Sequence, residues 1–270
     1  MNLPDPDKVA AIIRDVAATE IVPRFRSLSK ADIREKGPGD LVTIADEAAE
    51  RALTARLTDL LPGSLVVGEE ACAADPAILS RITAGDDPVW IIDPVDGTAN
   101  FANGRPIFAV LLALALGGRT VAGWIYDPVG ERMVVAERGQ GAWMGGQRLT
   151  ALPGGPIPSL RGSLSTKFFP AEEKKRLEAL RPHFASTYRL FCAAHEYLNL
   201  LTGQGQFACY NRIMPWDHAA GALAYAEAGG HVARWDGGDY QPGRTDGGIL
   251  MAGDQETWGD LRRLLLPNLA

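Results

Sequence analysis

The chain has 270 residues, of which 46% are hydrophobic and 22% are charged. These values exclude a disordered protein and provide enough apolar side chains for one large domain or two closely packed lobes. The net charge of -6 argues against a general binder of nucleic acid or of anionic membranes. A small anionic substrate is compatible with it, because a bound divalent cation inverts the charge of an acidic site.

The three cysteines are an odd number without close pairing, which predicts neither a disulfide framework nor a zinc site. The start of the chain lacks the basic and then apolar segments of a signal peptide. The longest apolar run, 108–116, is far shorter than the ~20 residues that a membrane span needs. We therefore expect a cytoplasmic protein.

In chain order, apolar residues recur first at helical spacing and then as short continuous runs. The spacing predicts helices over 9–17 and about 44–61, separated by an exposed and mobile loop over 34–40 that holds two glycines and a proline. The apolar runs that follow predict strands at 65–67, 89–92, 108–116, 121–126 and 133–136.

The loop over 153–156 consists of two prolines and two glycines. It predicts a boundary between an N-terminal lobe over 1–150 and a C-terminal α/β lobe over 151–270, packed as one compact unit. The second lobe has predicted helices at 171–180, 193–201 and 217–228, and a predicted strand at 207–211. The alternation of strands and helices indicates a mixed α/β fold.

The stretch with the clearest chemistry is 90–101, WIIDPVDGTANF. An apolar strand ends in Asp93, Asp96 follows three residues later, and Gly97 permits a tight turn, so that two carboxylates can converge on one point. Burying two like charges is costly unless a cation neutralises them, and oxygen ligands without histidine or cysteine favour magnesium over zinc. Gly97 and Thr98 would begin a short helix whose amides face an anion. Either Asp-Pro or Asp-Gly alone commonly makes only a turn.

Further carboxylates occur at the end of another strand and at the start of a helix. Glu69 and Glu70 end the apolar strand at 65–67, and Asp217 begins a predicted helix, where an aspartate often serves only as an N-cap. Together with 93–101, the segments 68–70 and 216–230 resemble the three motifs of the inositol monophosphatase family, which are magnesium-dependent, lithium-sensitive phosphatases. The resemblance extends from Lys36 to about Gly230.

The resemblance implies a layered αβαβα sandwich that usually assembles as a homodimer, with the metal and phosphate site in the lobe over 1–150. It also implies hydrolysis of a phosphate monoester by metal-activated water. The first magnesium ion would be held by Glu69, Asp93 and the carbonyl of Val95. The second would be held by Asp93, Asp96 and Asp217, and a third, weaker ion by Glu69 through water.

The same resemblance implies the catalytic groups. Thr98, hydrogen-bonded to Asp46, would orient and help deprotonate the attacking water, with Glu69 as the third catalytic residue. The amides of Gly97 and Thr98 would hold the phosphate. Lys36 lies in the loop that closes over the metals.

The expected substrate contacts depart from the family pattern. Inositol-selective relatives have an acidic residue where this chain has Tyr210, and their small-residue segment corresponds here to Phe191-Cys192-Ala193-Ala194. The bulky Phe191 would reshape the pocket for the leaving group, and the missing acid weakens the prediction of myo-inositol phosphate. We expect Lys36, Cys192, Ala193, Tyr210 and Arg212 to contact the substrate.

Two positions in this region have alternative interpretations. Arg212 would pair with a second phosphate or be a solvated arginine at a strand end. His195 and Glu196 begin a predicted helix and could face substrate, but an ordinary core or surface role is the favoured interpretation.

Three functions stay open from the sequence. The first is a phosphatase for inositol-1-phosphate or a similar small polyol or sugar phosphate. The second is the same chemistry on fructose bisphosphate, histidinol phosphate or a 3'-phosphorylated nucleotide. The third is a regulatory protein that keeps the fold without catalysis.

Overall fold

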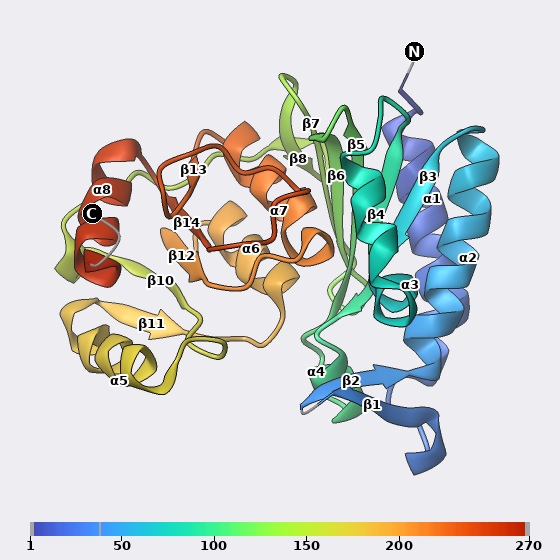
Figure 1. Cartoon of the computed structure of the whole chain (residues 1–270), viewed down its shortest axis with the longest axis horizontal. Helices are drawn as coiled ribbons and strands as arrows, with labels where there is room; N and C mark the ends of the chain where they lie inside the picture. The colour runs from blue at the N-terminus through green and yellow to red at the C-terminus, as the bar shows by residue number, and fades with distance from the viewer. Residues whose placement is uncertain (1–2, 38, 268–270) are drawn as a thin grey trace.

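The computed structural model describes residues 3–37 and 39–267. The chain forms five layers, in which two sheets alternate with three layers of helices (Figure 1). This arrangement is the αβαβα sandwich expected from the sequence. Within the described residues, no helix combines the length and the apolar character needed to cross a bilayer.

The helices are α1 (Pro6–Val16), α2 (Ile44–Leu60), α3 (Glu69–Ala74), α4 (Thr98–Ala102), α5 (Ala171–Leu180), α6 (Ala193–Leu201), α7 (Pro215–Glu227) and α8 (Gln255–Leu265). The strands of the first half are β1 (Ile33–Gly37), β2 (Asp40–Thr43), β3 (Leu65–Gly68), β4 (Val89–Asp96), β5 (Ala109–Leu116), β6 (Arg119–Asp127), β7 (Arg132–Glu137), β8 (Gly141–Met144) and β9 (Gln147–Arg148). The strands of the second half are β10 (Arg161–Leu164), β11 (Ser186–Tyr188), β12 (Phe207–Tyr210), β13 (His231–Arg234) and β14 (Ile249–Ala252).

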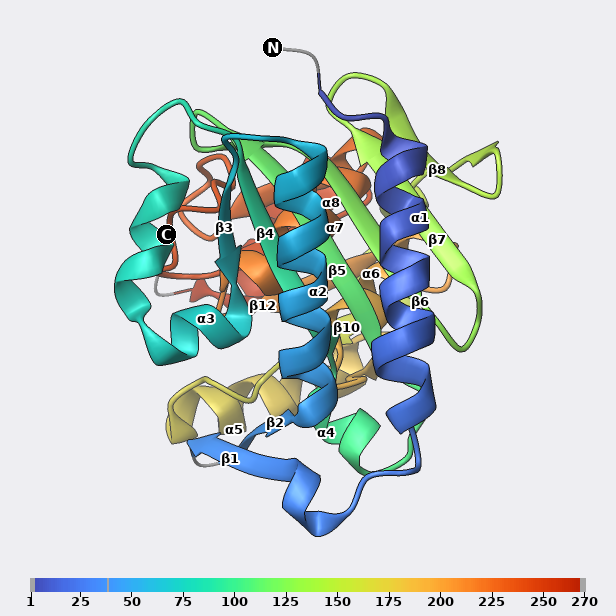
Figure 2. The same ribbon diagram turned by 90° about the vertical axis from the view of Figure 1, so that its right-hand side faces the viewer.

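The first sheet has seven strands in the order β3-β4-β5-β6-β7-β8-β9. Only β3 and β4 are parallel. Strand β4 is apolar without interruption because both of its faces are buried. Trp90 and Ile92 pack toward α1 and α2, whereas Val89 and Ile91 belong to the cluster on the opposite face, which includes α6 and α7. Figure 2 shows α1 and α2 lying side by side over the outer face.

Each of the two outer helices begins with a side-chain cap. Asp5 accepts a hydrogen bond from the amide of Asp7 at 2.9 Å, and proline occupies the first position of α1. Helix α2 begins with a capping box, in which Asp46 Oδ2 accepts from the Thr43 amide at 2.9 Å. The cap therefore fixes the start of α2 and the position of Asp46 together.

The second sheet has the strand order β11-β10-β12-β14-β13. Strands β11, β10 and β12 are parallel neighbours, so their carboxyl ends lie at one edge of the sheet. Helix α7 approaches the first sheet closely, because a Cβ atom at Gly123 would lie 2.9 Å from the Cα atom of Ala220. This contact packs the middle of α7 against β6.

Two details of the predicted elements are wrong. The predicted loop over 34–40, of which residue 38 lies outside the described residues, is a hairpin: β1 and β2 pair in antiparallel fashion with Glu35 opposite Leu41 and Gly37 opposite Asp40. Glu69 is the first residue of helix α3 instead of the last residue of a strand. The boundary between 1–150 and 151–270 stays a prediction.

Candidate functional site

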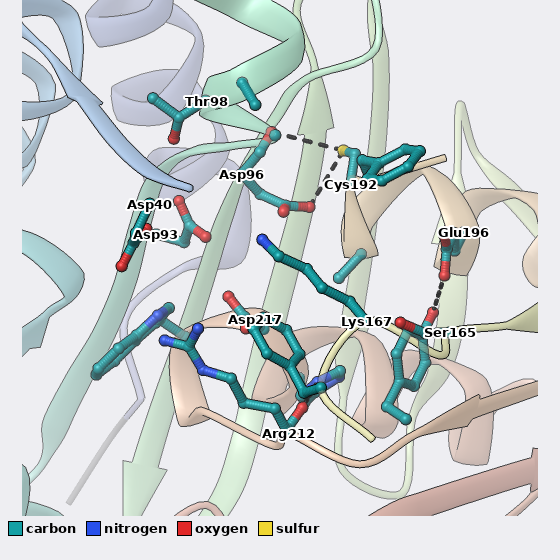
Figure 3. A pocket seen from close by; sticks show the side chains of 18 of the residues that line it. Asp40, Asp93, Asp96, Thr98, Ser165, Lys167, Cys192, Glu196, Arg212 and Asp217 are labelled. Atoms are coloured by element: carbon teal, nitrogen blue, oxygen red, sulfur yellow. Dashed lines mark hydrogen bonds between the residues drawn. The ribbon is translucent and has the colours of Figure 1, made fainter. Parts of the chain in front are cut away.

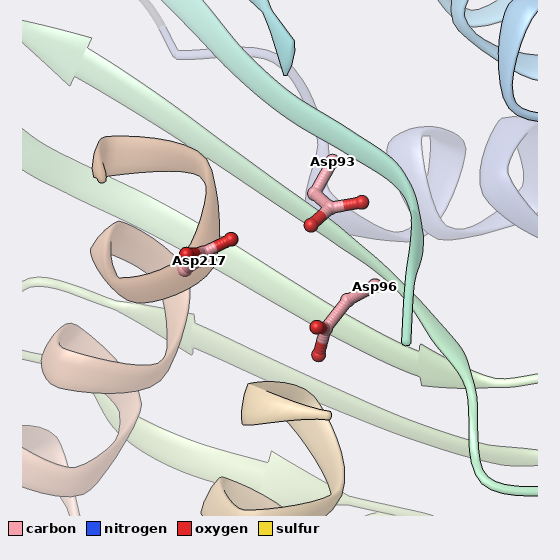
Figure 4. Close-up of side chains that lie close together, drawn as sticks. All are labelled: Asp93, Asp96 and Asp217. Atoms are coloured by element: carbon pink, nitrogen blue, oxygen red, sulfur yellow. The ribbon is translucent and has the colours of Figure 1, made fainter. Parts of the chain in front are cut away.

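Three aspartates from distant parts of the sequence lie together between the two sheets. Asp93 and Asp96 belong to the end of β4, where a bulge shifts the pairing with β5, and Asp217 belongs to the first turn of α7. Each contributes a carboxylate oxygen to a group whose atoms all lie within 4.8 Å of one another (Figure 4). Asp217 does not cap its helix, because α7 begins two residues earlier and Asp217 makes no capping hydrogen bond.

The three carboxylates repel one another. Burial and then the charges of Glu69 and Asp96 raise the pKa of Asp93 well above its usual range. Burial and then the charge of Asp96 have the same effect on the pKa of Asp217. Burial raises the pKa of Asp96 to about 6. A hard divalent cation with oxygen ligands would relieve this repulsion, so the donor set fits magnesium.

The start of α6 holds Asp96 in place. Its Oδ2 atom accepts a hydrogen bond from the Ala194 amide at 2.6 Å and lies 3.2 Å from the Sγ atom of Cys192. Gly97 next to it has φ of 89°, and a Cβ atom there would lie 2.8 Å from the carbonyl oxygen of Ile107. Only glycine therefore fits at position 97. Cys192 and Ala193 line the same pocket.

Thr98 and Asp46 form the hydrogen bond expected from the sequence. Thr98 Oγ1 lies 3.0 Å from Asp46 Oδ1 and 3.0 Å from the Val95 carbonyl oxygen. Burial raises the pKa of Asp46 to about 6, although hydrogen bonds from Thr43 oppose the shift. Asp46 thus has two contacts: Oδ2 caps α2, and Oδ1 faces Thr98.

Glu69 lines the pocket but is not part of the aspartate group. Lys36 Nζ lies 2.8 Å from Glu69 Oε1 and 2.9 Å from Glu70 Oε1. Burial alone would lower the pKa of Lys36, but the charges of both glutamates raise it. Burial and the charge of Glu69 raise the pKa of Glu70 to about 8. Of these three residues only Glu69 lines the pocket, so Lys36 does not reach it directly and is linked to it through Glu69.

The opposite wall contains a buried carboxylate with several donors. Tyr210 donates to Glu196 Oε2 at 2.6 Å, Ser163 donates to the same oxygen, and the Leu190 amide donates to Oε1 at 2.8 Å. Glu196 lines the pocket, but these bonds give it a structural role. His195 is also buried, with Nε2 3.2 Å from the Phe108 carbonyl oxygen.

The structure adds pocket residues that the sequence prediction missed: Asp40, Ser165, Lys167, Phe168 and Arg189. Arg212 lines the pocket with them, and Figure 3 shows Lys167 extending into the pocket on the side of the aspartates. Lys167 and Arg189 follow the ends of β10 and β11. They could have been predicted as pocket residues only if those two strands had been recognised in the sequence.

Comparisons with known proteins agree with this geometry. Residues 5–264 match the model of the inositol monophosphatase family. The chain is 33% identical to inositol-1-monophosphatase of Mesorhizobium japonicum, over 86% of this chain and 85% of that protein. It is 32% identical to Nus factor SuhB of Vibrio cholerae, over 83% of each protein. The IMPase structure from Thermotoga maritima superimposes with a TM-score of 0.80, at 25% identity and covering 98% of both chains. The chain therefore belongs to the inositol monophosphatase family.

Proposed function

We propose that the protein is a magnesium-dependent phosphomonoesterase for a small polyol or sugar phosphate, of the kind that inositol-1-phosphate represents. The observation that carries this proposal is the convergence of Asp93, Asp96 and Asp217 beside the hydrogen bond between Thr98 and Asp46. A purely structural acidic cluster does not require a threonine–aspartate pair at its edge, whereas hydrolysis of a phosphate ester does require a group that positions water.

The oxygen ligands divide into two overlapping sets. Glu69, Asp93 and the Val95 carbonyl would hold one magnesium ion, and Asp93, Asp96 and Asp217 a second. A third, weaker ion would contact Glu69 through water. The chemistry that two such ions supply is activation of water and stabilisation of the leaving oxygen.

The chain's own groups would position the reactants. The amides of Gly97 and Thr98, at the start of α4, would bind the phosphate oxygens. Thr98 would accept a proton from the attacking water as it passes its own hydroxyl proton to Asp46 Oδ1, 3.0 Å away. The raised pKa of Asp46, about 6, places this carboxylate closer to the range in which it accepts a proton near neutral pH.

The leaving group would lie against the second half of the chain, where Cys192, Ala193 and Tyr210 line the pocket. The Tyr210 hydroxyl is occupied by Glu196, so no free carboxylate takes the place of the acid found in inositol-selective relatives. Fructose bisphosphate, histidinol phosphate and 3'-phosphorylated nucleotides therefore belong in the test beside inositol-1-phosphate.

The test is turnover of 4-nitrophenyl phosphate and of these four substrates, with magnesium and with excess chelator. We expect hydrolysis with magnesium, none with chelator, and inhibition by lithium and by calcium, whose looser coordination misplaces the reacting water. Full activity in chelator after metal-free purification would contradict the proposal. A homodimer, as the family resemblance implies, is expected in sedimentation.

A second candidate function has its own support, because several relatives at 31–32% identity carry the name Nus factor SuhB. A regulatory protein of that kind would need the fold but no turnover. It is favoured if the purified protein binds magnesium and yet hydrolyses none of the five phosphate esters.

A further inference from the structure

Three positively charged side chains enter the pocket from three adjacent strand ends. Strands β11, β10 and β12 are parallel neighbours, and Arg189, Lys167 and Arg212 follow their respective carboxyl ends. The register pairs Leu164 with Cys209, so Lys167 and Arg212 each lie three residues beyond paired positions. Carboxyl ends of parallel strands are the usual place of a ligand site in α/β proteins. All three cations line the pocket that contains the aspartates.

Aromatic rings hold these cations in place. Lys167 and Arg212 lie over the Phe168 ring, at 4.9 and 4.8 Å from its centre, and Arg189 lies 4.1 Å from the centre of the Phe191 ring. Throughout the described part of the chain, no carboxylate lies within ion-pair or hydrogen-bond distance of any of the three cations. The charge of Arg212 does oppose the rise in the pKa of Asp217 that burial causes, but none of the three cations is held by a direct carboxylate contact, so their hydrogen-bond donors are available to a ligand.

Phe191 is held in an unfavourable conformation next to Arg189. Its φ is 58° and its side chain is 54% exposed, although a bulky residue seldom adopts positive φ. Asn100 Nδ2 donates to the Leu190 carbonyl at 2.9 Å, and Glu196 accepts from the Leu190 amide, so the loop is fixed on both sides. The ring that supports Arg189 is therefore presented to the pocket by a rigid loop.

Glu196, the acidic side chain on this wall, does not compete with a substrate anion for the three cations. Glu196 is buried and accepts hydrogen bonds from Ser163, Tyr210 and the Leu190 amide. Its charge attracts Arg189, but burial still lowers the pKa of that arginine. A half-buried arginine of this kind gains most from an anion that enters the pocket.

We propose that the substrate carries a second anionic group, a phosphate or a carboxylate, which Lys167, Arg189 and Arg212 bind while the phosphate to be hydrolysed lies at the aspartates. The proposal rests on the phosphatase function proposed above and narrows its substrate class: among the substrates named there, it favours fructose bisphosphate and phosphorylated nucleotides with a second phosphate over inositol-1-phosphate. The two anionic groups of the substrate would thereby be neutralised in different ways, one by metal ions and the other by positively charged side chains. The protein as a whole has a net charge of -6. The phenylalanine rings serve as supports for the cations.

The experiment compares matched pairs of esters that differ in the second charge. The pairs are fructose 1,6-bisphosphate with fructose 1-phosphate, 3-phosphoglycerate with glycerol 3-phosphate, and adenosine 3',5'-bisphosphate with adenosine 3'-phosphate. In at least one pair, kcat/KM for the doubly anionic member should exceed that of its partner by about tenfold or more, the size expected of a charged hydrogen bond.

The variants Lys167→Gln, Arg189→Gln and Arg212→Gln should each reduce that ratio, mainly through KM. Lys175→Gln, which removes an exposed charge from α5 outside the pocket, is the matched control and should leave the ratio unchanged. Equal kcat/KM within every pair would overturn the proposal. Variants that lower kcat/KM equally for both members of a pair would also overturn it, because the cations would then bind the phosphate that is hydrolysed.

Failure of the phosphatase function gives a different result. If wild-type protein does not hydrolyse 4-nitrophenyl phosphate or any ester, the same pairs are compared by calorimetric dissociation constants in magnesium. Tighter binding of the doubly anionic member by about tenfold, lost in Arg212→Gln, would support the anion site without the chemistry. Equal dissociation constants would reject it.

Discussion

The two walls of the pocket carry opposite charges and are built by different means. The N-terminal half contributes carboxylates from one contiguous stretch, 93–96, at the end of a fully buried strand. The second sheet contributes Lys167, Arg189 and Arg212 from three separate strand ends. The carboxylates of the acidic wall lie close together and repel one another, whereas the cations of the basic wall lie over aromatic rings. The acidic wall thus needs a cation, and the basic wall offers cations.

Each wall also contains one residue that departs from its pattern: Asp217 by its origin in the chain, and Glu196 by its charge. Asp217 contributes to the acidic group although it comes from α7 in the second half. Glu196 lies on the basic wall, and its hydrogen bonds are all made within the protein. The charge of a pocket residue therefore does not by itself show whether the residue binds a ligand. The hydrogen bonds that it already makes within the protein must be considered as well.

The largest expected effect is that of Asp93→Asn. Asp93 is the one side chain assigned to both proposed metal ions, so kcat should fall further than in any other single variant, and below a tenth of wild type even in excess magnesium. Asp217→Asn is the matched comparison, since excess magnesium should restore part of its activity. Steady-state kinetics over a magnesium titration distinguishes the two. Equal rescue of both variants would contradict the separate roles.

Thr98→Ala should lower kcat by roughly 10²–10⁴, the usual contribution of a general acid–base group. Magnesium affinity should stay close to wild type, because no proposed ligand is removed. Thr98→Ser keeps the hydroxyl and should keep most of the activity. A near-normal kcat for Thr98→Ala would reject the proton transfer, and loss of metal binding would show that Thr98 acts on the metal site.

Tyr210→Phe tests whether the basic wall contains a structural acid. Glu196 would keep its other two donors but lose a 2.6 Å hydrogen bond, so the free energy of unfolding should fall by ~1–3 kcal/mol. Tyr126→Phe is the control, because the Tyr126 hydroxyl has no hydrogen-bond partner within the described residues. Urea unfolding measures both. An unchanged stability with a raised KM would assign Tyr210 to the substrate instead.

The smallest effect concerns the acidic wall without metal. Asp217→Asn removes one of three mutually repelling charges, so in chelator its Tm should exceed that of wild type. A gain of ~1 kcal/mol corresponds to roughly 2–4 °C for a chain of this size. Added magnesium should abolish or reverse the difference. Asp87→Asn, at an exposed position, should behave as wild type under both conditions. A lower Tm for Asp217→Asn in chelator would mean that the aspartates do not destabilise the metal-free protein.

The acidic wall could be predicted from the sequence because its signals are local. Asp93, Asp96 and Gly97 lie within five residues, directly after an apolar run that is long enough to identify as a strand. Asp217 and Asp46 are distant in sequence, and their assignment depended on the family resemblance. The hydrogen bond between Asp46 and Thr98 at 3.0 Å was expected on that basis.

The basic wall could not be predicted in the same way. Strands β10 and β11 are RGSL and STY, too short and too polar to show a strand pattern, and their adjacency is a property of the tertiary fold. Glu196 looked like a helix residue with no particular partner, because Ser163 and Tyr210 come from other strands. The hairpin of β1 and β2 could not be predicted because glycine is typical of loops, although Gly37 is the last residue of β1 and pairs with Asp40.

The double use of Asp46 affects how relatives of this protein are to be interpreted. One oxygen of its carboxylate caps the helix that supports the first sheet, and the other meets Thr98. A descendant that abandons hydrolysis would still gain stability from an aspartate there, since a side-chain cap contributes about 0.5–2 kcal/mol. Its presence is therefore no sign of an active phosphatase. The second contact of Thr98, to the Val95 carbonyl three residues earlier, is local and supports no long helix, so replacement of the threonine in a relative would be the more reliable mark of lost catalysis.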